Sequence, residues 1–370
     1  MRTTWATTLL LLVLFLLLLM LSAVAQAQSY TNSYGIWGYT NTNGTITITT
    51  YSGSGGDVTI PERIPETPNG LPVTSIGVEA FGNCGSLTNV TIPNSVTNIE
   101  DYAFAYCYRV TNVSIPSTVT SIGVFAFGEC PGLTNVTIPN SVTNIGGAAF
   151  YFCSGLTSVT IPNSVTSIGS GAFGNCSGVT NVIIPNSVTS IENNTFNGCS
   201  GLTSVAIPNS VTNIGEGAFE GCISLAGVTI GNGVSSIGDA AFAFCASLTS
   251  VYFQGNAPGP STDSRVFSGD NNITIYYLPG TKGWGSTLGT LPAVLWNPQV
   301  QPDSFVFRTN QFGFTITGSS SLAVVIEAGT NLANPTWYPL QTNILNGNPL
   351  YFSDPNWSNY PSRFYRLRWP

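Results

Sequence analysis

The sequence predicts a β-rich solenoid of 23-residue repeats, with a parallel β-sheet along one face, followed by a small antiparallel β-sandwich. Three observations predict this fold. The eight cysteines lie 23 residues apart, from Cys84 to Cys245, and a phenylalanine stands three residues before each of them. After Asn297 the repeat stops, and short alternating apolar and polar segments replace it. A fixed period of this length is typical of stacked repeat architectures.

The apolar positions of one repeat explain why it folds only in a stack. Leu156, Val159 and Ile161 form an L-x-x-V-x-I pattern, in which Val159 and Ile161 point to the same side of a strand. Pro162 ends that strand because it lacks an N–H group for the sheet. A single repeat cannot cover its own apolar side, so neighbouring coils must cover it.

These residues resemble the BspA-like leucine-rich repeats. The signature I-P-x-S-V-T-x-I-G-x-x-A-F-x-x-C-x-x-L-T-x-V-x runs nearly intact through residues 161–183, and related copies span residues 58–280. The resemblance implies a curved or straight solenoid with a parallel sheet on one face. It also implies a surface or secreted role in adhesion and protein binding, without naming the ligand.

The first 27 residues read as a signal peptide. Arg2 supplies the positive charge, Leu9 to Leu21 is almost entirely apolar, and Ala25-Gln26-Ala27 offers a cleavage site. A retained membrane anchor is the alternative. The rest of the chain has no apolar stretch of membrane length, so we expect no membrane span in the mature chain and a secreted or cell-surface location.

Turn signals and changes in composition divide the mature chain. Residues 28–57 are predicted to form an N-terminal cap with a β-hairpin at Asn43-Gly44, and residues 58–297 the solenoid with its own C-terminal cap. A linker is predicted at 298–302 and the β-sandwich at 303–370, which is similar in a general way to fibronectin-type accessory modules. Three arginines, Arg363, Arg366 and Arg368, lie near the chain end, and one hypothesis is that they belong to a tail for secretion or surface attachment.

The cysteines occupy one position in every repeat, so stacking places them in a single ladder. Side chains in register point the same way, whereas a disulfide requires converging Cβ vectors. We expect buried free thiols, with disulfides, metal binding and redox chemistry as alternatives. The cysteine ladder comprises Cys84, Cys107, Cys130, Cys153, Cys176, Cys199, Cys222 and Cys245.

Outward positions of the predicted strands carry short hydroxyl and amide side chains, which could bind sugar hydroxyls or a peptide backbone. The alternative is that they are solvated residues that suit a strand and need no ligand. Binding to an ordered lattice such as ice is a further alternative. The variation at Ile183, Ala206 and Gly227 weakens it, because these residues interrupt the regular rows. The predicted ligand-binding residues are Asn89, Thr91, Asn112, Ser114, Asn135, Thr137, Ser158 and Thr160.

Composition argues against catalysis. Charged residues make up 7% of the chain, the net charge is -7, and histidine is absent. We therefore expect no catalytic residue, no metal site, no cofactor and no nucleic-acid partner. The predicted function is a non-catalytic binding or adhesion protein whose partner is an extracellular protein or polysaccharide. A structural matrix component is the alternative, and a glycan-active enzyme would need two carboxylates facing each other, for which Glu216 and Glu220 are the nearest pair.

Overall fold

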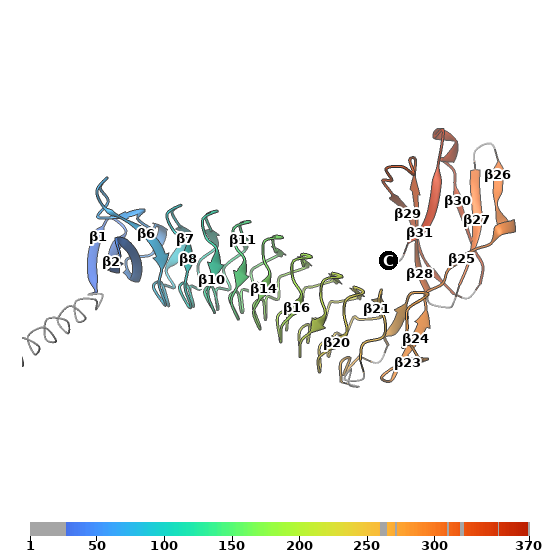
Figure 1. Cartoon of the computed structure of the whole chain (residues 1–370), viewed down its shortest axis with the longest axis horizontal. Helices are drawn as coiled ribbons and strands as arrows, with labels where there is room; N and C mark the ends of the chain where they lie inside the picture. Colours follow the sequence, from blue (N-terminus) through green and yellow to red (C-terminus); the bar gives the residue numbers. More distant parts are fainter. Residues whose placement is uncertain are drawn as a thin grey trace, which may run out of the picture.

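The computed structural model describes residues 27–259, 265–270, 272–308, 311–318, 322–346 and 348–368. It shows an elongated solenoid with a β-sandwich at its C-terminal end (Figure 1). The predicted solenoid with parallel strands and a C-terminal antiparallel module is confirmed. Nearly all of the predicted signal peptide lies outside the described residues. None of the described helices reaches the length and hydropathy that a membrane span requires.

One strand of each coil belongs to a parallel array that we call the front sheet. Its inward residues are valine and isoleucine, and a proline follows most of the strands, as the repeat pattern predicts. The array is hydrogen-bonded in three segments, of which β11 ends the first and β13 begins the second. Its strands are β4 (Gly56–Thr59), β7 (Leu87–Thr91), β9 (Asn112–Ser114), β11 (Asn135–Thr137), β13 (Ser158–Thr160), β15 (Asn181–Ile183), β17 (Ser204–Ile207), β19 (Gly227–Ile230), β21 (Ser250–Phe253), β22 (Thr274–Tyr277) and β24 (Leu291–Leu295).

A second parallel array, the side sheet, was not predicted from the sequence. It forms because the residues after the Pro-x-Ser turn extend again for two positions, with a buried isoleucine at the second. Each side-sheet strand pairs in register with a neighbouring coil, as Ile122 does with Ile145. The strands are β6 (Leu71–Ile76), β8 (Asn98–Ile99), β10 (Ser121–Ile122), β12 (Asn144–Ile145), β14 (Ser167–Ile168), β16 (Ser190–Ile191), β18 (Asn213–Ile214) and β20 (Ser236–Ile237).

The third side of each coil, which we call the turn face, contains the phenylalanine and the cysteine. The phenylalanine rings stack through the core from Phe81 to Phe242 and on to Phe267, with neighbouring centroids 4.8–5.7 Å apart. At the N-terminal end, Tyr51 lies 5.1 Å from Phe81 and so closes the stack. All these rings are buried, although Tyr51 and Phe267 at the two ends of the stack keep a few per cent of their surface exposed. Burying a ring of this size stabilises the fold by about 2–3 kcal/mol.

The N-terminal strands extend the side sheet. Strands β2 (Gly35–Thr42) and β3 (Thr45–Ser52) pair antiparallel on either side of Asn43-Gly44, and β3 then pairs parallel with β6. Strand β1 (Gln28–Asn32) pairs with β2, and the short β5 (Arg63–Ile64) pairs with β6. The hairpin thus occupies the sheet edge that the first coil would otherwise expose.

The C-terminal module consists of two antiparallel sheets around one core. Residues 298–302, predicted as a linker, contain β25, which pairs with β27 and so belongs to the module. Ion pairs hold its arginines: Arg366 and Arg368 contact Glu327, and Arg363 contacts Asp354. The elements are β25 (Gln299–Val300), β26 (Val306–Arg308), β27 (Gln311–Thr317) and β30 (Leu350–Asp354) in one sheet, β28 (Leu322–Gly329), β29 (Tyr338–Leu345) and β31 (Phe364–Arg368) in the other, and two short 3-10 helices, η1 (Pro302–Ser304) and η2 (Trp357–Asn359). Strand β23 (Thr287–Leu288) pairs antiparallel with β24.

Candidate binding surface

The structure brings the eight predicted binding residues together on the outward face of the front sheet. Two parallel rows form, because strands β7, β9 and β11 pair in register. Asn89 aligns with Asn112 and Asn135 in these rows. Strand β13 continues both rows, because Ser158 and Thr160 hold the same positions in the next repeat. We call this surface the sheet strip: Asn89, Thr91, Asn112, Ser114, Asn135, Thr137, Ser158 and Thr160. Asn89 is half-buried, and the other members are exposed.

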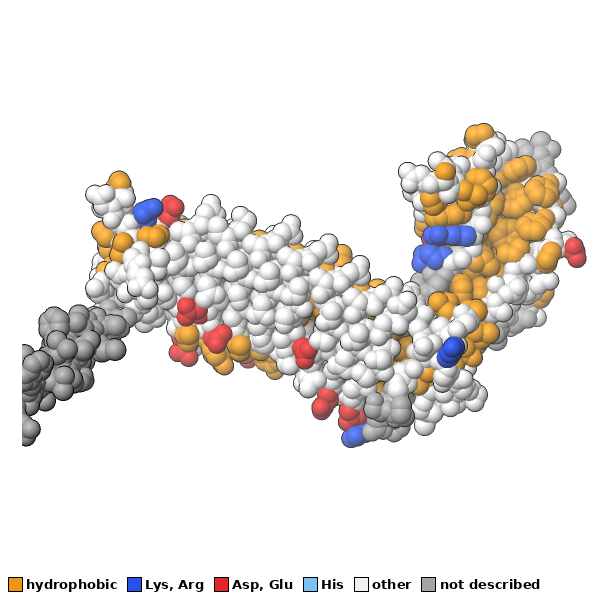
Figure 2. All heavy atoms as spheres, in the orientation of Figure 1, with side chains coloured by type: hydrophobic (Ala, Val, Ile, Leu, Met, Phe, Trp, Pro, Cys, Tyr) orange, Lys and Arg blue, Asp and Glu red, His pale blue; other side chains and the backbone are white. Residues whose placement is uncertain are grey.

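Most polar groups of the sheet strip are available to a ligand. Asn89 is the exception, because its amide donates to Asp57 at 2.6 Å. The hydrogen bonds from Asn89 and Thr88 hold the pKa of the Asp57 carboxyl below its usual range. Across the described residues, the side chains of the other seven strip members form no hydrogen bond. Figure 2 shows that few charged or hydrophobic side chains interrupt the visible surface of the solenoid's middle coils.

A neighbouring threonine row behaves differently, because its hydroxyls are already bonded. Thr111 donates to the backbone oxygen of Thr88, and Thr134 donates to that of Thr111, over 3.2 Å in both cases. These hydroxyls strengthen the contact between coils and offer less to a ligand. This row was not among the predicted binding residues, and its bonds to the backbone of the preceding coil are visible only in the structure.

A shallow depression of about 580 Å³ lies on the sheet strip between β11 and β13. Strip residues Asn135, Thr137, Ser158 and Thr160 line it, together with Asn140, Asn163 and Ile183 from its margins. It coincides with the point where one hydrogen-bonded segment of the front sheet ends and the next begins. Ile183 is 55% exposed and adds an apolar contact to a surface that is otherwise polar.

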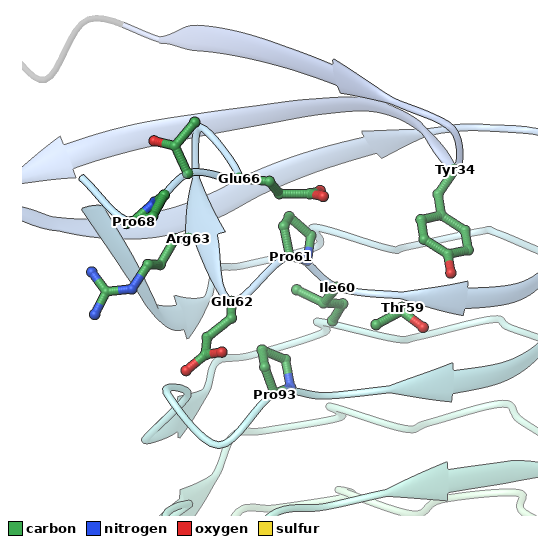
Figure 3. Close-up of a pocket in the computed structure, with 10 residues that line it drawn as sticks. Tyr34, Thr59, Ile60, Pro61, Glu62, Arg63, Glu66, Pro68 and Pro93 are labelled. Atoms are coloured by element: carbon green, nitrogen blue, oxygen red, sulfur yellow. The ribbon is translucent and has the colours of Figure 1, made fainter. Parts of the chain in front are cut away.

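The N-terminal end of the front sheet opens into a second pocket of about 540 Å³ (Figure 3). Thr59 belongs to the same row as Thr91, since β4 and β7 pair in register there. Figure 3 shows Pro61 between Tyr34, from the turn that joins β1 and β2, and Glu66, from the loop at residues 62–69, which we call the inserted loop. The pocket therefore continues the sheet strip beyond its first strand.

Hydrogen bonds hold this pocket in place. The Asn32 amide donates to the Glu66 carboxylate at 2.5 Å, and the same asparagine accepts from the Trp37 indole at 2.9 Å. Arg63 donates to the backbone oxygen of Gly70, which closes the inserted loop. This pocket was not predicted from the sequence, because the inserted loop and the turn between β1 and β2 meet only in the folded chain.

The C-terminal end of the same surface is covered. Tyr252 and Tyr276 occupy the row of Thr229, and both are buried in the core of the β-sandwich. The Trp296 indole donates to the backbone oxygen of Ala323 at 2.9 Å, which fastens the module to the last coil. The module thus ends the exposed surface. A C-terminal cap and a β-sandwich were both predicted from the sequence, but the packing of the sandwich over Tyr252 and Tyr276 was not.

All eight cysteines are free in the structure, and only Cys84 is partly exposed. Each of the other seven donates its S–H to the phenylalanine carbonyl of the preceding coil, as Cys153 does to Phe127 at 3.1 Å. The same bond recurs at Cys107, Cys130, Cys176, Cys199, Cys222 and Cys245, over 3.1–3.3 Å. Burial raises the pKa of Cys199 to about 12, and it raises that of Cys176 far above the usual value.

The carboxylates make structural contacts. Glu220 accepts from the Asn197 amide at 3.1 Å, and Asp270 accepts from the backbone N–H of Cys245 at 2.9 Å. Burial raises the pKa of Asp270. No group of three or more potential metal ligands occurs among the described residues.

The fold and its exposed sheet define a leucine-rich-repeat solenoid protein. The family model for the BspA type leucine rich repeat region matches six copies across residues 74–202 and 166–283, which together cover more than half of the chain. The chain belongs to the BspA-type leucine-rich repeat family. No curated protein matches it.

Several solved structures are similar. A leucine-rich repeat protein from Bacteroides ovatus shares 25% identity over 68% of this chain and 77% of its own, with a TM-score of 0.47. The leucine-rich repeat protein of T. pallidum shares 29% identity over 60% of this chain and 91% of its own, with a TM-score of 0.46. A leucine-rich cell surface protein from Faecalibacterium prausnitzii shares 26% identity over 70% and 97%, with a TM-score of 0.32.

Proposed function

We propose that this chain is a non-catalytic binding protein, secreted or held at the cell surface, and that an extended polysaccharide lies along its sheet strip. The observation that carries the proposal is the row of free hydroxyl and amide groups at Ser114, Thr137 and Thr160 and their neighbours. These groups repeat at the spacing of the coils, about 5 Å, and few charges interrupt them.

Both ends of the surface support an elongated ligand. The pocket at Tyr34 and Glu66 offers a site for a chain end, and the buried Tyr252 and Tyr276 mark where the exposed surface stops. Sugar hydroxyls donate and accept hydrogen bonds, as do the threonine, serine and asparagine side chains of the sheet strip. Exposed Ile183 beside the depression suits the apolar face of a sugar ring.

The test is the binding of labelled protein, residues 28–370, to an array of polysaccharides and to intact cells. A variant with Thr137→Arg and Thr160→Arg places two large cations in the depression. The matched control, Asn144→Arg with Ser167→Arg, adds the same charge at the same spacing on the side sheet, where both residues are exposed.

We expect saturable binding to an uncharged polysaccharide that the sheet-strip variant loses and the side-sheet variant keeps. Equal binding by all three proteins would contradict the role of the sheet strip. If the unmodified protein binds a protein and not a polysaccharide, and the sheet-strip variant loses that binding, the sheet strip remains the binding surface but the proposed class of ligand is wrong.

A further inference from the structure

A second exposed surface lies on the turn face of the N-terminal coils. Phe125 is at its centre, with ring centroids 5.3 Å from Tyr102, 5.6 Å from Tyr106 and 6.1 Å from Tyr151. Tyr108 and Phe152 extend it, and they are 51% and 42% exposed. We call these six residues the turn-face cluster. Figure 2 shows hydrophobic and acidic side chains together along the lower edge of this half of the solenoid.

The backbone at the cluster is unfavourable for aromatic residues. In every 23-residue coil, the positions two before and two after the core phenylalanine have a positive φ, which is 57° at Tyr102, 62° at Tyr106 and 54° at Phe125. Elsewhere these positions hold glycine or asparagine, as at Gly171 and Asn194, or alanine, glutamate and, at Phe244, one further phenylalanine. Glycine and asparagine tolerate the left-handed conformation, whereas a bulky residue in it costs about 1–2 kcal/mol.

Packing of the hydrophobic core does not explain these aromatic residues. The core stack is formed by the other phenylalanine of each coil, such as Phe104 and Phe127, which are fully buried. Four bulky rings in left-handed positions, at Tyr102, Tyr106, Phe125 and Phe152, therefore raise the energy of the fold without filling its interior. Strained residues that cluster on a surface are typical of a site that binds something.

Carboxylates lie next to the rings. Glu79 precedes Tyr102 in the row before the core phenylalanine, and Glu129 stands between Tyr106 and Phe152 in the row after it. The backbone N–H of Glu79 donates to the oxygen of Asp101, so these acidic residues sit on adjacent coils. Asp101 is exposed, although one of its oxygens also accepts from the N–H of Val124. Arg109 is the basic residue that follows Tyr108 in the chain.

The geometry of the rings favours a cation over a sugar. Phe125 is tilted by 33° to Tyr102 and by 46° to Tyr106, so the rings do not form a flat platform on which a chain of sugars could stack. Tilted aromatic faces beside carboxylates attract lysine and arginine side chains through cation–π contacts and ion pairs. We propose that the turn-face cluster is a second binding site, separate from the sheet strip, which holds a lysine- or arginine-bearing segment of another protein.

The test measures binding of a fluorescent octalysine peptide to the protein by anisotropy, with a glycine-serine peptide as the uncharged probe. In the first variant, Tyr102→Asn with Phe125→Asn, two rings are replaced by the residue that other coils carry at these positions. We expect binding of octalysine about tenfold weaker than to the unmodified protein. The midpoint of thermal unfolding should stay the same or rise, because the strain is removed.

Two carboxylate variants separate this site from general attraction to an acidic protein. Glu79→Gln with Glu129→Gln should weaken octalysine binding, whereas Glu216→Gln with Glu220→Gln, further along the chain, should not. The proposal is overturned if both pairs weaken binding equally, or if the aromatic variant binds like the unmodified protein. It is also overturned if the aromatic variant unfolds at a lower temperature, or if the rings instead bind a neutral cello-oligosaccharide.

Discussion

Tyr252 and Tyr276 stack with their ring centroids 5.1 Å apart and an interplanar angle of 17°, on the outward face of a sheet whose first coils carry threonine or serine in that row. Both rings belong to the hydrophobic core of the C-terminal module, where they pack with residues such as Ile316 and Val324. The surface that is open to solvent in the early coils is therefore an interior surface in the last two.

This relationship predicts that Tyr252→Thr with Tyr276→Thr will separate the module from the solenoid. Each ring should contribute about 2–3 kcal/mol through its burial, so the double variant removes most of the apolar contact. We expect faster proteolysis near residues 297–303 and two resolved thermal transitions. Tyr338→Thr is the control, because Tyr338 is 63% exposed. A single unchanged transition in the double variant would show that the module docks by other contacts.

The buried thiols predict a loss of stability in alkaline solution. Burial raises the pKa of Cys176, Cys199 and Cys222 above the ordinary value of 9.0, so the folded chain keeps protons that the unfolded chain releases. Their stabilising effect is complete below pH 9 and is lost as the pH rises toward the folded pKa values. We expect the free energy of unfolding to fall by about 1.4 kcal/mol per pH unit for each such thiol.

Urea unfolding between pH 7 and pH 10 would measure how the free energy of unfolding changes with pH. The variant Cys176→Ala should show a smaller fall above pH 9, because it lacks one buried thiol. Alkylation by iodoacetamide gives an independent measurement. Cys84 should react in the folded protein, since it alone is partly exposed, and the other seven should react only on unfolding. Rapid alkylation of all eight in the folded protein would contradict the buried ladder.

Glu327 predicts that the module is sensitive to acid. Burial alone would raise the pKa of this carboxyl, but hydrogen bonds and ion pairs from Arg368 and Arg366, at 2.6 Å and 2.7 Å, lower it overall. A carboxyl whose pKa is lowered by folding stabilises the folded state at pH values above its unfolded pKa. That contribution is lost as the pH falls through the pKa of the folded state. Because both arginines are 40–50% exposed, solvent weakens the effect.

We expect Glu327→Gln to destabilise the module by about 1–3 kcal/mol at pH 7. The stability of this variant should also depend less on pH between pH 5 and pH 3. Thermal unfolding of the module across this range would measure both effects. Glu62→Gln, at an exposed position of the N-terminal loop, is the matched control. An equal change in both variants would mean that the ion pairs of Glu327 contribute nothing specific.

Much of the solenoid could be predicted from its period. The alternation of Val159 and Ile161 indicates which side of each strand faces inward, and Pro162 indicates where the strand ends. The same reasoning identified the outward rows, because residues at one position of a repeat must stack on each other. It did not predict the side sheet, because its strands after β6 have only two residues each and are too short to show alternation.

Other features depend on contacts between distant residues. The bond from Asn89 to Asp57 joins positions 32 residues apart, and the pocket at Tyr34 and Glu66 brings the turn between β1 and β2 against the inserted loop. Tyr252 reads in sequence as one more outward residue of a strand. Its burial follows from the later module, which no local pattern reports.

The sequence by itself determined the coil, its stacking and the face on which hydroxyl and amide side chains gather, because a repeated apolar pattern can be buried only by identical neighbours. The tertiary structure decided where that face begins and ends, at the pocket beside Tyr34 and at the buried Tyr252 and Tyr276. It also decided which aromatic residues fill the core and which, such as Tyr102 and Phe125, lie strained on the surface. These outcomes depend on backbone conformation and on packing between separate segments, and neither can be predicted from the spacing of residues within one repeat.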